Sequence, residues 1–535
     1  MQFAHLFTPC AIGKCSLKNR IIMALFPTKY ATESKVNAKM MAFYRTRARG
    51  GAAMIVLECP CVDYPAAYKG PKELRMDDEQ YAQGIRRLLE VIHKEGAKAF
   101  MHLTYPKERI FKEPVDGAKK KNSGWVLPLA NTMAPEEAER ILLIMADGAR
   151  RAREIGYDGV EIQASYGGLI AQLLSPLLNK RTDSLGGALE NRTGFLTRLI
   201  RETKKAAGSD FPVIIKLVCD EFVPGGLGVD EAKRIAVLVQ QAGADAIVAN
   251  GGNKATKHRT IPTHESPPGA LVELASQIKA SVSIPVVAIG KINSPELAED
   301  IIGRGQADLV AMARPLVADP DLPNKARTGN VDGIRRCVCC LEDCVEKGVP
   351  GLGRACTVNP FVGHEHDWVL GPAEKKKKVL VVGGGPGGMQ AAILCSIRGH
   401  EVSLWERSHE LGGQAKLAGI APFKGEMVEV VRYLKHALEE TSVIVTPGKQ
   451  ATVPEILAHA PDVLIVATGS RPGHLEVTGI ESDRVVDVRS VYENQGGGVG
   501  QHVVVVGGGE TGCETAEWLA ETGRHVTVVE MLPEV

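Results

Sequence analysis

The chain has 535 residues, enough for about three domains, and its 44% apolar content is ordinary for globular proteins with large buried cores. Its 64 Lys and Arg residues balance 63 Asp and Glu residues, so no strong field favours nucleic acid or an anionic membrane, and we expect a small-molecule partner. The first residues lack a signal-peptide pattern, and no apolar run reaches the roughly 18 residues of a membrane span. The 12 cysteines suit a reducing compartment, so we expect the protein in the cytoplasm. A homo-oligomer is left open.

Short β-rich runs alternate with helical stretches through the first 330 residues. Strands are expected at residues 20–24, 54–57, 98–102, 159–163, 213–218, 246–249, 285–289 and 309–312. Helices are expected at residues 38–49, 80–95, 135–155, 191–206, 229–241 and 295–303. Near-continuous apolar strands between amphipathic helices indicate a parallel sheet covered by helices, so we predict an α/β fold with a closed (β/α)8 TIM barrel over residues 1–330. An open doubly wound sheet is the alternative.

Polar residues where these strands end are candidate site residues, because barrel chemistry lies at the carboxyl ends of the strands. Lys216 lies within an apolar strand, where an unpaired buried ammonium would cost on the order of several kcal/mol, so it needs an anionic partner. A reduced flavin and the barrel carboxylate Glu161 are both candidates for that partner. The last two strands end near Gly290 and Arg314, where backbone amides and a guanidinium suit a phosphate.

Four cysteines follow the predicted barrel with the spacing C-x2-C-x3-C-x11-C, at Cys337, Cys340, Cys344 and Cys356. Three thiolates on one short loop and a fourth from a later segment can hold the corners of a [4Fe–4S] cube. A zinc knuckle and a disulfide pair are the alternatives, although zinc favours two C-x2-C hooks and nothing indicates an oxidising compartment. Cys339 is off the spacing. We assign residues 331–374 to a cluster loop and linker.

Two glycine-rich loops then follow apolar strands, and each loop leads into a helix and a second strand that ends in an acid. The glycines and acids are Gly383, Gly385, Gly388 and Glu406 in the first copy, and Gly507, Gly509, Gly512 and Glu530 in the second. This is the dinucleotide fingerprint: glycines allow close approach of a pyrophosphate, helix amides bind it, and the acid binds ribose hydroxyls. Two copies in this order resemble the FAD and NAD(P)H domains of disulfide-reductase-like flavoproteins.

We expect the FAD domain at residues 375–498 and the start of the NAD(P)H domain at 499–535. A carboxylate at Glu530 would repel a 2′-phosphate, so NADH is favoured over NADPH. Because Val535 lies one strand into the second nucleotide domain, we expect a C-terminally truncated product in which FAD and NADH bind more weakly than the motifs suggest.

Three further stretches, at residues 19–20, 175–192 and 313–320, resemble the flavin barrel of the Old Yellow Enzyme superfamily. With the cysteine loop and both nucleotide loops, the whole chain resembles the multi-domain branch of 2,4-dienoyl-CoA reductase, enoate reductase and trimethylamine dehydrogenase type. The resemblance implies FMN in the barrel. The residues at positions that touch the flavin or its phosphate in this family are Thr28, His102, Lys216, Gly290 and Arg314.

The chain departs from this family at several positions. His102 stands where relatives usually carry Gln, and Lys216 stands where they carry Arg, but both keep a hydrogen-bond donor. Gly168 occupies the usual place of the proton-donating Tyr. Tyr166 is then a candidate donor or merely a packing residue, since a phenol must reach the substrate carbon before its chemistry counts. His258 is a candidate second active-site histidine or a solvated surface residue.

These features predict an NADH-dependent ene reductase in which electrons pass from NADH through FAD, the [4Fe–4S] cluster and FMN to an activated C=C bond. The substrate would be an enoate, an enoyl-CoA or a dienoyl-CoA. Its carbonyl would be polarised by Gln163, Tyr166 or His258. One alternative is an amine dehydrogenase of the trimethylamine dehydrogenase type, although residues 24–28 lack the cysteine that tethers FMN in that type. The other is a catalytically impaired flavin-binding remnant.

Overall fold

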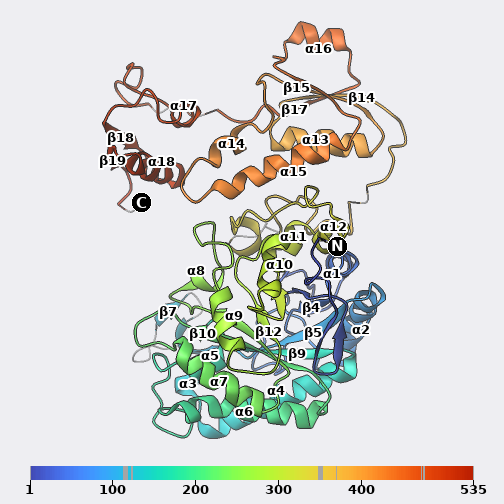
Figure 1. Cartoon of the computed structure of the whole chain (residues 1–535), viewed down its shortest axis with the longest axis vertical. Coiled ribbons are helices and arrows are strands. Elements are labelled where there is room, and N and C mark those ends of the chain that lie inside the picture. Colours follow the sequence, from blue (N-terminus) through green and yellow to red (C-terminus); the bar gives the residue numbers. More distant parts are fainter. Residues whose placement is uncertain are drawn as a thin grey trace. The chain divides into compact units, whose positions relative to one another are not determined.

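The computed structural model describes residues 2–111, 119–121, 124–346, 353–368, 370–471, 473 and 476–533. The chain divides into two compact units, Met1–Trp368 and Val369–Val535, and each is described by itself. Figure 1 labels their helices and strands along the chain.

The first unit is built on a closed barrel of eight strands. In order around the barrel they are β3 (Ile21–Met23), β4 (Met54–Leu57), β5 (Lys98–Leu103), β9 (Gly159–Ala164), β10 (Val213–Asp220), β11 (Ala246–Gly251), β12 (Val286–Ala288) and β13 (Leu309–Ala311). Every neighbouring pair is parallel, including β13 with β3. The predicted TIM barrel is therefore confirmed, and the open sheet is wrong because the last strand pairs with the first.

Helices cover the outside of this barrel. They are α1 (Ala38–Arg49), α2 (Glu79–Lys94), α4 (Pro135–Ile155), α6 (Leu189–Ala207), α7 (Val229–Gln241), α9 (Val272–Lys279), α10 (Pro295–Gly303), α11 (Arg314–Ala318) and α12 (Leu322–Thr328). Capping side chains mark where three of these helices begin: Asn37, Asp78 and Ser294 each accept a backbone N–H of the first turn of α1, α2 and α10, respectively. The helices bury their apolar faces against the outward-facing strand residues in one large core.

A second, smaller core fills the inside of the barrel. Inward-facing residues of the strands pack there against the hairpin of β1 (Cys10–Ile12) and β2 (Cys15–Leu17); they include Ile22, Met54, Phe100, Ile214, Ala246, Val287 and Leu309. These residues lie toward the amino-terminal ends of their strands. The hairpin therefore closes the amino-terminal end of the barrel, and only the carboxyl end can serve as a mouth.

Several elements near the mouth were absent from the sequence-based expectation. An antiparallel sheet of β6 (Glu108–Phe111), β7 (Lys119–Lys121) and β8 (Gly124–Pro128) follows β5. Short helices α3 (Leu129–Thr132), α5 (Leu169–Leu174) and α8 (Lys257–Thr260) lie in the loops after β5, β9 and β11, and the π-helix η1 (Glu342–Glu346) lies in the cysteine loop. These insertions fall after carboxyl strand ends, where barrel enzymes carry their variable parts.

The second unit contains two β-α-β arrangements. A parallel sheet has the order β16 (Ile444–Pro447), β15 (Glu401–Glu406), β14 (Lys378–Val382) and β17 (Val463–Val466), and a separate parallel pair consists of β18 (His502–Val506) and β19 (His525–Val529). Its helical segments are α13 (Pro386–Ile397), α14 (Gln414–Ala418), η2 (Gly425–Met427), α15 (Val428–Glu439), α16 (Val453–His459), α17 (Val488–Glu493) and α18 (Glu510–Glu521). None of the helices in the described part of the chain combines the length and apolar character needed to cross a membrane.

A buried ion pair ties the segment after the last cysteine to the barrel. The Arg47 guanidinium on α1 is fully buried, pairs with the Glu365 carboxylate, and also donates to the Leu316 carbonyl of α11 at 3.2 Å. Asn359 Nδ2 donates to the Ala318 carbonyl at the end of the same helix, at 2.9 Å. The chain that follows Cys356 is thus held against the helix that begins with Arg314.

This arrangement predicts a large effect for Glu365→Gln. The substitution leaves the buried Arg47 charge without its counter-ion, so we expect a loss of about 3–5 kcal/mol in the free energy of unfolding of the first unit. The matched control is Glu190→Gln, because Glu190 pairs with Arg234 in the open, with both side chains more than 60% exposed. The control should change stability by less than about 1 kcal/mol in the same denaturant titration. Equal losses for both variants would contradict the role of the buried pair.

Candidate functional site

Polar side chains occupy one half of the barrel mouth. Phe100, Ile214 and Ala246 face the inner core, so every second residue further along the same strands also faces inward. Gly159 shares that face, because a Cβ placed there would lie 2.3 Å from the Phe100 ring. Polar inward residues further along these strands are His102 on β5, Glu161 and Gln163 on β9, Lys216 in the middle of β10 and Asn250 on β11. The other half carries small or apolar residues, Ala24, Ile289, Ala311 and Ala313.

His102 and Glu161 form a buried pair on adjacent strands. His102 Nδ1 lies 2.8 Å from Glu161 Oε1, and both side chains are almost fully buried. Burial lowers the pKa of His102, despite the favourable carboxylate. Burial alone would raise the pKa of Glu161, but the Lys216 ammonium and the His102 bond together hold it below its usual value. A neutral imidazole beside a carboxylate must donate through Nδ1, which leaves Nε2 as an acceptor, so the hydrogen-bond donor expected of His102 from the sequence is used within the protein and is not offered to a ligand.

Lys216 is half-buried and makes no ion pair within the part of the chain that the structure describes. Its register neighbours are Gln163 on β9 and Val248 on β11. Glu161 influences the ammonium electrostatically without contacting it. The lysine therefore keeps its donors for an anionic group at the mouth. Of the two partners considered from the sequence, a reduced flavin and Glu161, this agrees with the flavin.

Gln163 and Asn250 both contact Ser165 and both leave a polar atom unused. Gln163 Nε2 donates to the Ser165 carbonyl at 3.2 Å, and Asn250 Nδ2 donates to Ser165 Oγ at 3.1 Å. Gln163 Oε1 and Asn250 Oδ1 are buried with no hydrogen-bond partner among the described residues. A backbone carbonyl only accepts, so it fixes the orientation of the Gln163 amide and leaves its oxygen as the unused end. That oxygen is an acceptor and cannot polarise a substrate carbonyl, which the sequence led us to expect of Gln163. Such orphaned atoms fit a site that is completed by a ligand.

Asn250 was missed by the sequence reasoning. A usable signal existed, since Asn250 lies two and four residues after the inward-facing Val248 and Ala246 on the same strand.

The segment after β9 places Tyr166 in a rare backbone conformation. Tyr166 has φ +56° and Gly167 has φ +62°, and such left-handed geometry in a non-glycine residue is uncommon outside turns and functional sites. Lys107 Nζ lies 5.4 Å from the centre of the Tyr166 ring. The backbone of Gly168 is not in the left-handed conformation that favours glycine. A Cβ added there would lie 3.3 Å from the Ser165 carbonyl oxygen. His258 lies on α8 and is exposed.

Thr28 is completely buried in the loop after β3. Its hydroxyl donates to the Glu58 carboxylate, and its backbone N–H donates to Glu58 Oε1 at 3.0 Å. Burial raises the pKa of Glu58, partly offset by these bonds. The Thr28 carbonyl accepts the Arg354 N–H at 3.1 Å, two residues before Cys356. Contact of Thr28 with a flavin stays a prediction.

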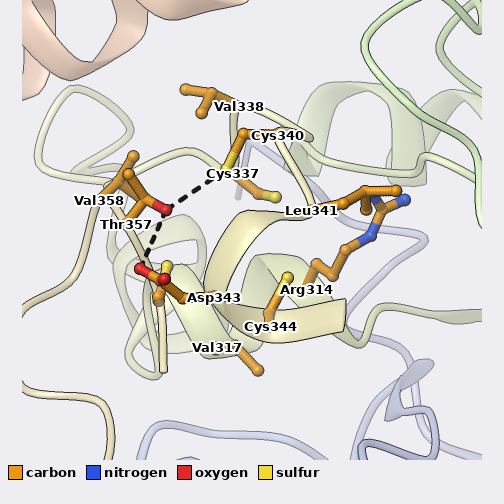
Figure 2. A pocket seen from close by; sticks show the side chains of 11 residues that line it. Arg314, Val317, Cys337, Val338, Cys340, Leu341, Asp343, Cys344, Thr357 and Val358 are labelled. Carbon is orange, nitrogen blue, oxygen red and sulfur yellow. Dashed lines mark hydrogen bonds between the residues drawn. The ribbon is translucent and has the colours of Figure 1, made fainter. Parts of the chain in front are cut away.

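Gly290 and Arg314 lie at the ends of the last two strands, as expected. Gly290 has φ +107°, and a Cβ there would lie 2.8 Å from the Leu271 side chain, so no larger residue fits. Arg314 begins α11 and lines one side of the cavity of the cysteines, with its side chain directed toward Leu341 (Figure 2). Its Nη1 atom is buried and has no partner in the part of the chain described here. A buried guanidinium with a free donor fits an anion.

The four spaced cysteines line one cavity together with Arg314, Asp343 and Thr357 (Figure 2). Burial, and then the charge of Cys337, raise the pKa values of Cys344 and Cys356 to about 12. Thiols this crowded ionise together only around a strongly cationic centre.

The donor set of this cavity suits a cluster better than the two alternatives. All twelve cysteines, which lie in the described ranges, are free thiols, so the disulfide is wrong. No group of three or more His, Cys, Asp or Glu residues in those ranges could hold one metal ion, as a zinc knuckle must. In a [4Fe–4S] cube each cysteine binds a different iron, so the sulfurs surround a larger space.

The first nucleotide loop has the geometry that its glycines predict. Gly383 has φ +112°, and a Cβ on Gly388 would lie 1.8 Å from the Gly383 carbonyl oxygen. Gly385 is the N-cap of α13 and has open space around it. Glu406, at the end of β15, accepts the Gly384 N–H at 2.5 Å and the Ser408 N–H at 2.8 Å. Open space at a helix N-terminus suits a pyrophosphate.

The second loop repeats this geometry. Gly507 has φ +105°, and a Cβ on Gly512 would lie 1.9 Å from the Gly507 carbonyl oxygen. Gly509 is the N-cap of α18, again with open space around it. Glu530 accepts the Gly508 N–H at 2.6 Å, and this bond and that of the Leu532 N–H hold its pKa below the usual value. The two loops therefore share one design.

Two family models match the chain. Residues 5–332 match the NADH:flavin oxidoreductase / NADH oxidase family, and residues 377–535 match the pyridine nucleotide-disulphide oxidoreductase family. The NADH oxidase of Thermoanaerobacter brockii is 37% identical over 100% of this chain and 84% of its own length. The cinnamate reductase of Clostridium sporogenes is 32% identical over 99% of this chain and 83% of its own length. A solved 2-naphthoyl-CoA reductase in complex with 2-naphthoyl-CoA is similar with a TM-score of 0.91, at 32% identity, covering 98% of this chain and 83% of that one.

The buried state of His102 predicts how stability depends on pH. The folded protein holds the pKa of His102 below its ordinary 6.5, so below pH 6.5 the unfolded chain binds a proton that the folded chain does not. Wild type should therefore lose stability on acidification relative to His102→Gln, by up to about 1.4 kcal/mol for each pH unit below 6.5. Denaturant midpoints of both holoproteins between about pH 7.5 and 5.5 measure this, and Glu161 stays ionised throughout. A constant difference between the two proteins would show that His102 has the same pKa in the folded and the unfolded chain, which would contradict this prediction.

Proposed function

Since the chain belongs to the NADH:flavin oxidoreductase / NADH oxidase family, we propose that it is an NADH-dependent flavin and iron–sulfur oxidoreductase that reduces an activated C=C bond. The observation that carries this proposal is the cavity of four cysteines, which shares Arg314 with the end of the last barrel strand. A cluster held by these cysteines would thus lie beside a group bound at the barrel mouth, within one unit. That arrangement suits electron transfer to a group bound in the barrel.

When bound, FAD takes a hydride from NADH, a [4Fe–4S] cluster carries single electrons, and FMN delivers a hydride to the substrate. We assign FMN to the barrel mouth, where Thr28, His102, Lys216, Gly290 and Arg314 would hold it. Cys337, Cys340, Cys344 and Cys356 would hold the cluster. The two glycine loops, with Glu406 and Glu530, would hold FAD and NADH. The domain layout proposed is 1–330, 331–374, 375–498 and 499–535.

The polar half of the mouth would orient a planar ligand that carries both hydrogen-bond donors and an edge that becomes anionic. Lys216 contributes a positive charge on the inward face, which favours a ligand that becomes anionic. The His102 imidazole, fixed by Glu161, offers an acceptor at Nε2. The free amide oxygen of Gln163 offers a second acceptor. The apolar half, with Ala311 and Ala313, leaves room beside these groups.

Tyr166 would supply the proton that completes the reduction. Hydride addition to the β-carbon leaves negative charge that a proton at the α-carbon must quench. The phenol of Tyr166 holds such a proton in a strained loop beside the mouth. The Lys107 ammonium near its ring would stabilise the phenolate left behind. His258 stays an alternative donor.

The substrate class proposed is an unsaturated carbonyl compound of the enoate, enoyl-CoA or dienoyl-CoA type. Support comes from the similar cinnamate reductase and 2-naphthoyl-CoA reductase, each named for reduction of an unsaturated acid or thioester. The amine dehydrogenase alternative is less supported, since the loop at residues 24–28 carries no cysteine. Twelve free thiols favour a reducing cytoplasm. A homo-oligomer stays a prediction.

Anaerobic mixing tests the proposed function directly. We expect NADH to bleach the flavin absorbance of the purified holoprotein, and cinnamate or a similar enoate to restore it. NADPH should act more slowly, because the Glu530 carboxylate repels a 2′-phosphate. Bleaching by amines alone would favour the amine dehydrogenase, and protein without bound flavin would refute the proposal.

Replacing Tyr166 tests the proton donor. Tyr166→Phe should lower kcat for enoate reduction by about 10²–10⁴-fold, the usual contribution of a positioned acid. The matched control is Tyr68→Phe, because the Tyr68 hydroxyl is engaged with Ser34 Oγ at 2.7 Å. Stopped-flow reoxidation of the reduced flavin by enoate measures the step. Equal rates for wild type and Tyr166→Phe would assign the proton to another group.

A further inference from the structure

One hydroxyl group lies between a cysteine of the cavity and a carboxylate. Thr357 Oγ1 lies 3.6 Å from Cys340 Sγ and 3.2 Å from Asp343 Oδ2, and all three residues line the cavity (Figure 2). The Asp343 carboxylate is therefore linked to the Cys340 sulfur through the threonine hydroxyl.

Two chain segments hold this arrangement in place. Asp343 lies on η1, next to Cys344, and Thr357 directly follows Cys356. The Ala355 N–H donates to the Asp343 carbonyl at 3.2 Å and ties the two segments together. The three-residue contact is thus part of the frame that positions the third and fourth cysteines.

Binding to iron changes what the threonine can do. A protonated Cys340 can donate to Thr357 Oγ1, while Thr357 donates to Asp343. A thiolate bound to iron has no proton, so the single hydroxyl proton goes either to the Cys340 sulfur or to the Asp343 carboxylate. A carboxylate is the stronger acceptor. Asp343 therefore withholds from Cys340 a hydrogen bond that Thr357 could otherwise give.

Hydrogen bonds to cluster sulfurs and the net charge nearby are the protein's main means of setting a cluster's reduction potential. We propose that Asp343, acting through Thr357, keeps the potential of the cluster low by adding a negative charge and by diverting the Thr357 proton from Cys340. This inference rests on the proposed cluster site. Asp343 and Thr357 are positioning residues, and their effect would be to favour electron transfer out of the reduced cluster toward the barrel.

The test is a redox titration of the holoprotein, with the reduced cluster followed by its electron paramagnetic resonance signal. Asp343→Asn removes the charge and frees the Thr357 proton, so the ratio of reduced to oxidised cluster at a fixed potential should rise about tenfold, or about 59 mV for a one-electron couple. Thr357→Val alone should shift the midpoint little. The double variant Asp343→Asn with Thr357→Val should show a clearly smaller rise of the midpoint potential than Asp343→Asn alone. The double variant Asp343→Asn with Thr357→Ser should show the full rise again.

Glu346→Gln is the matched charge control. Glu346 lies on the same π-helix but pairs with Lys257 at 2.7 Å, and it does not line the cavity. Its midpoint should move by less than a third of the Asp343→Asn shift. An equal shift, or equal rises in Asp343→Asn and the double variant, would overturn the inference. A clear fall of the midpoint in Thr357→Val would also overturn it, because Thr357 would then already donate to Cys340. Wild-type protein that lacks iron after anaerobic purification would instead refute the proposed cluster itself.

Discussion

Side chains on a closed ring of parallel strands must alternate between the interior and the surrounding helices, and this alternation decides what the barrel presents at its mouth. The same period that sends Phe100, Ile214 and Ala246 into the lower core turns His102, Lys216 and Asn250 inward further along their strands. The β1–β2 hairpin packs against the inward-facing residues and so fills the lower end of the barrel. A shift of one residue in any of these strands would turn its polar group toward the helices.

Much of this framework follows from the sequence. The observed bounds of α1, α4, α7 and α10 match the bounds predicted from the sequence to the residue. Capping residues such as Asn37 and Ser294, and the proline at position 135, mark where such helices begin. The strands were found because both of their faces are apolar. The sheet of β6, β7 and β8 was not found, because β6 and β7 carry charged residues and its strands show no common apolar pattern. The hydroxyl of Thr28 illustrates another limit: its bond to Glu58 joins residues 30 positions apart, which no local pattern reveals.

The nucleotide loops were the easiest site to foresee, because their chemistry is local. In both copies one glycine is needed for helix–strand contact, one leaves space at a helix start, and a carboxylate 22 residues further along accepts a loop N–H. The barrel mouth differs, since its groups come from four strands. Candidate residues could be chosen there from the sequence. The pairing of His102 with Glu161 could not be predicted, because it depends on which strands are neighbours in the closed barrel.

The contact between Thr28, in the loop after β3, and Arg354, in the segment that carries the fourth cysteine, has a consequence for how the protein matures. The Thr28 carbonyl accepts the Arg354 N–H, and Thr28 is itself held by Glu58 at the end of the second barrel strand. The place of Cys356 is therefore tied to the folded start of the barrel. A chain whose barrel start is misfolded would lack the contact that holds the segment of the fourth cysteine, and so would be impaired in taking up iron and sulfide.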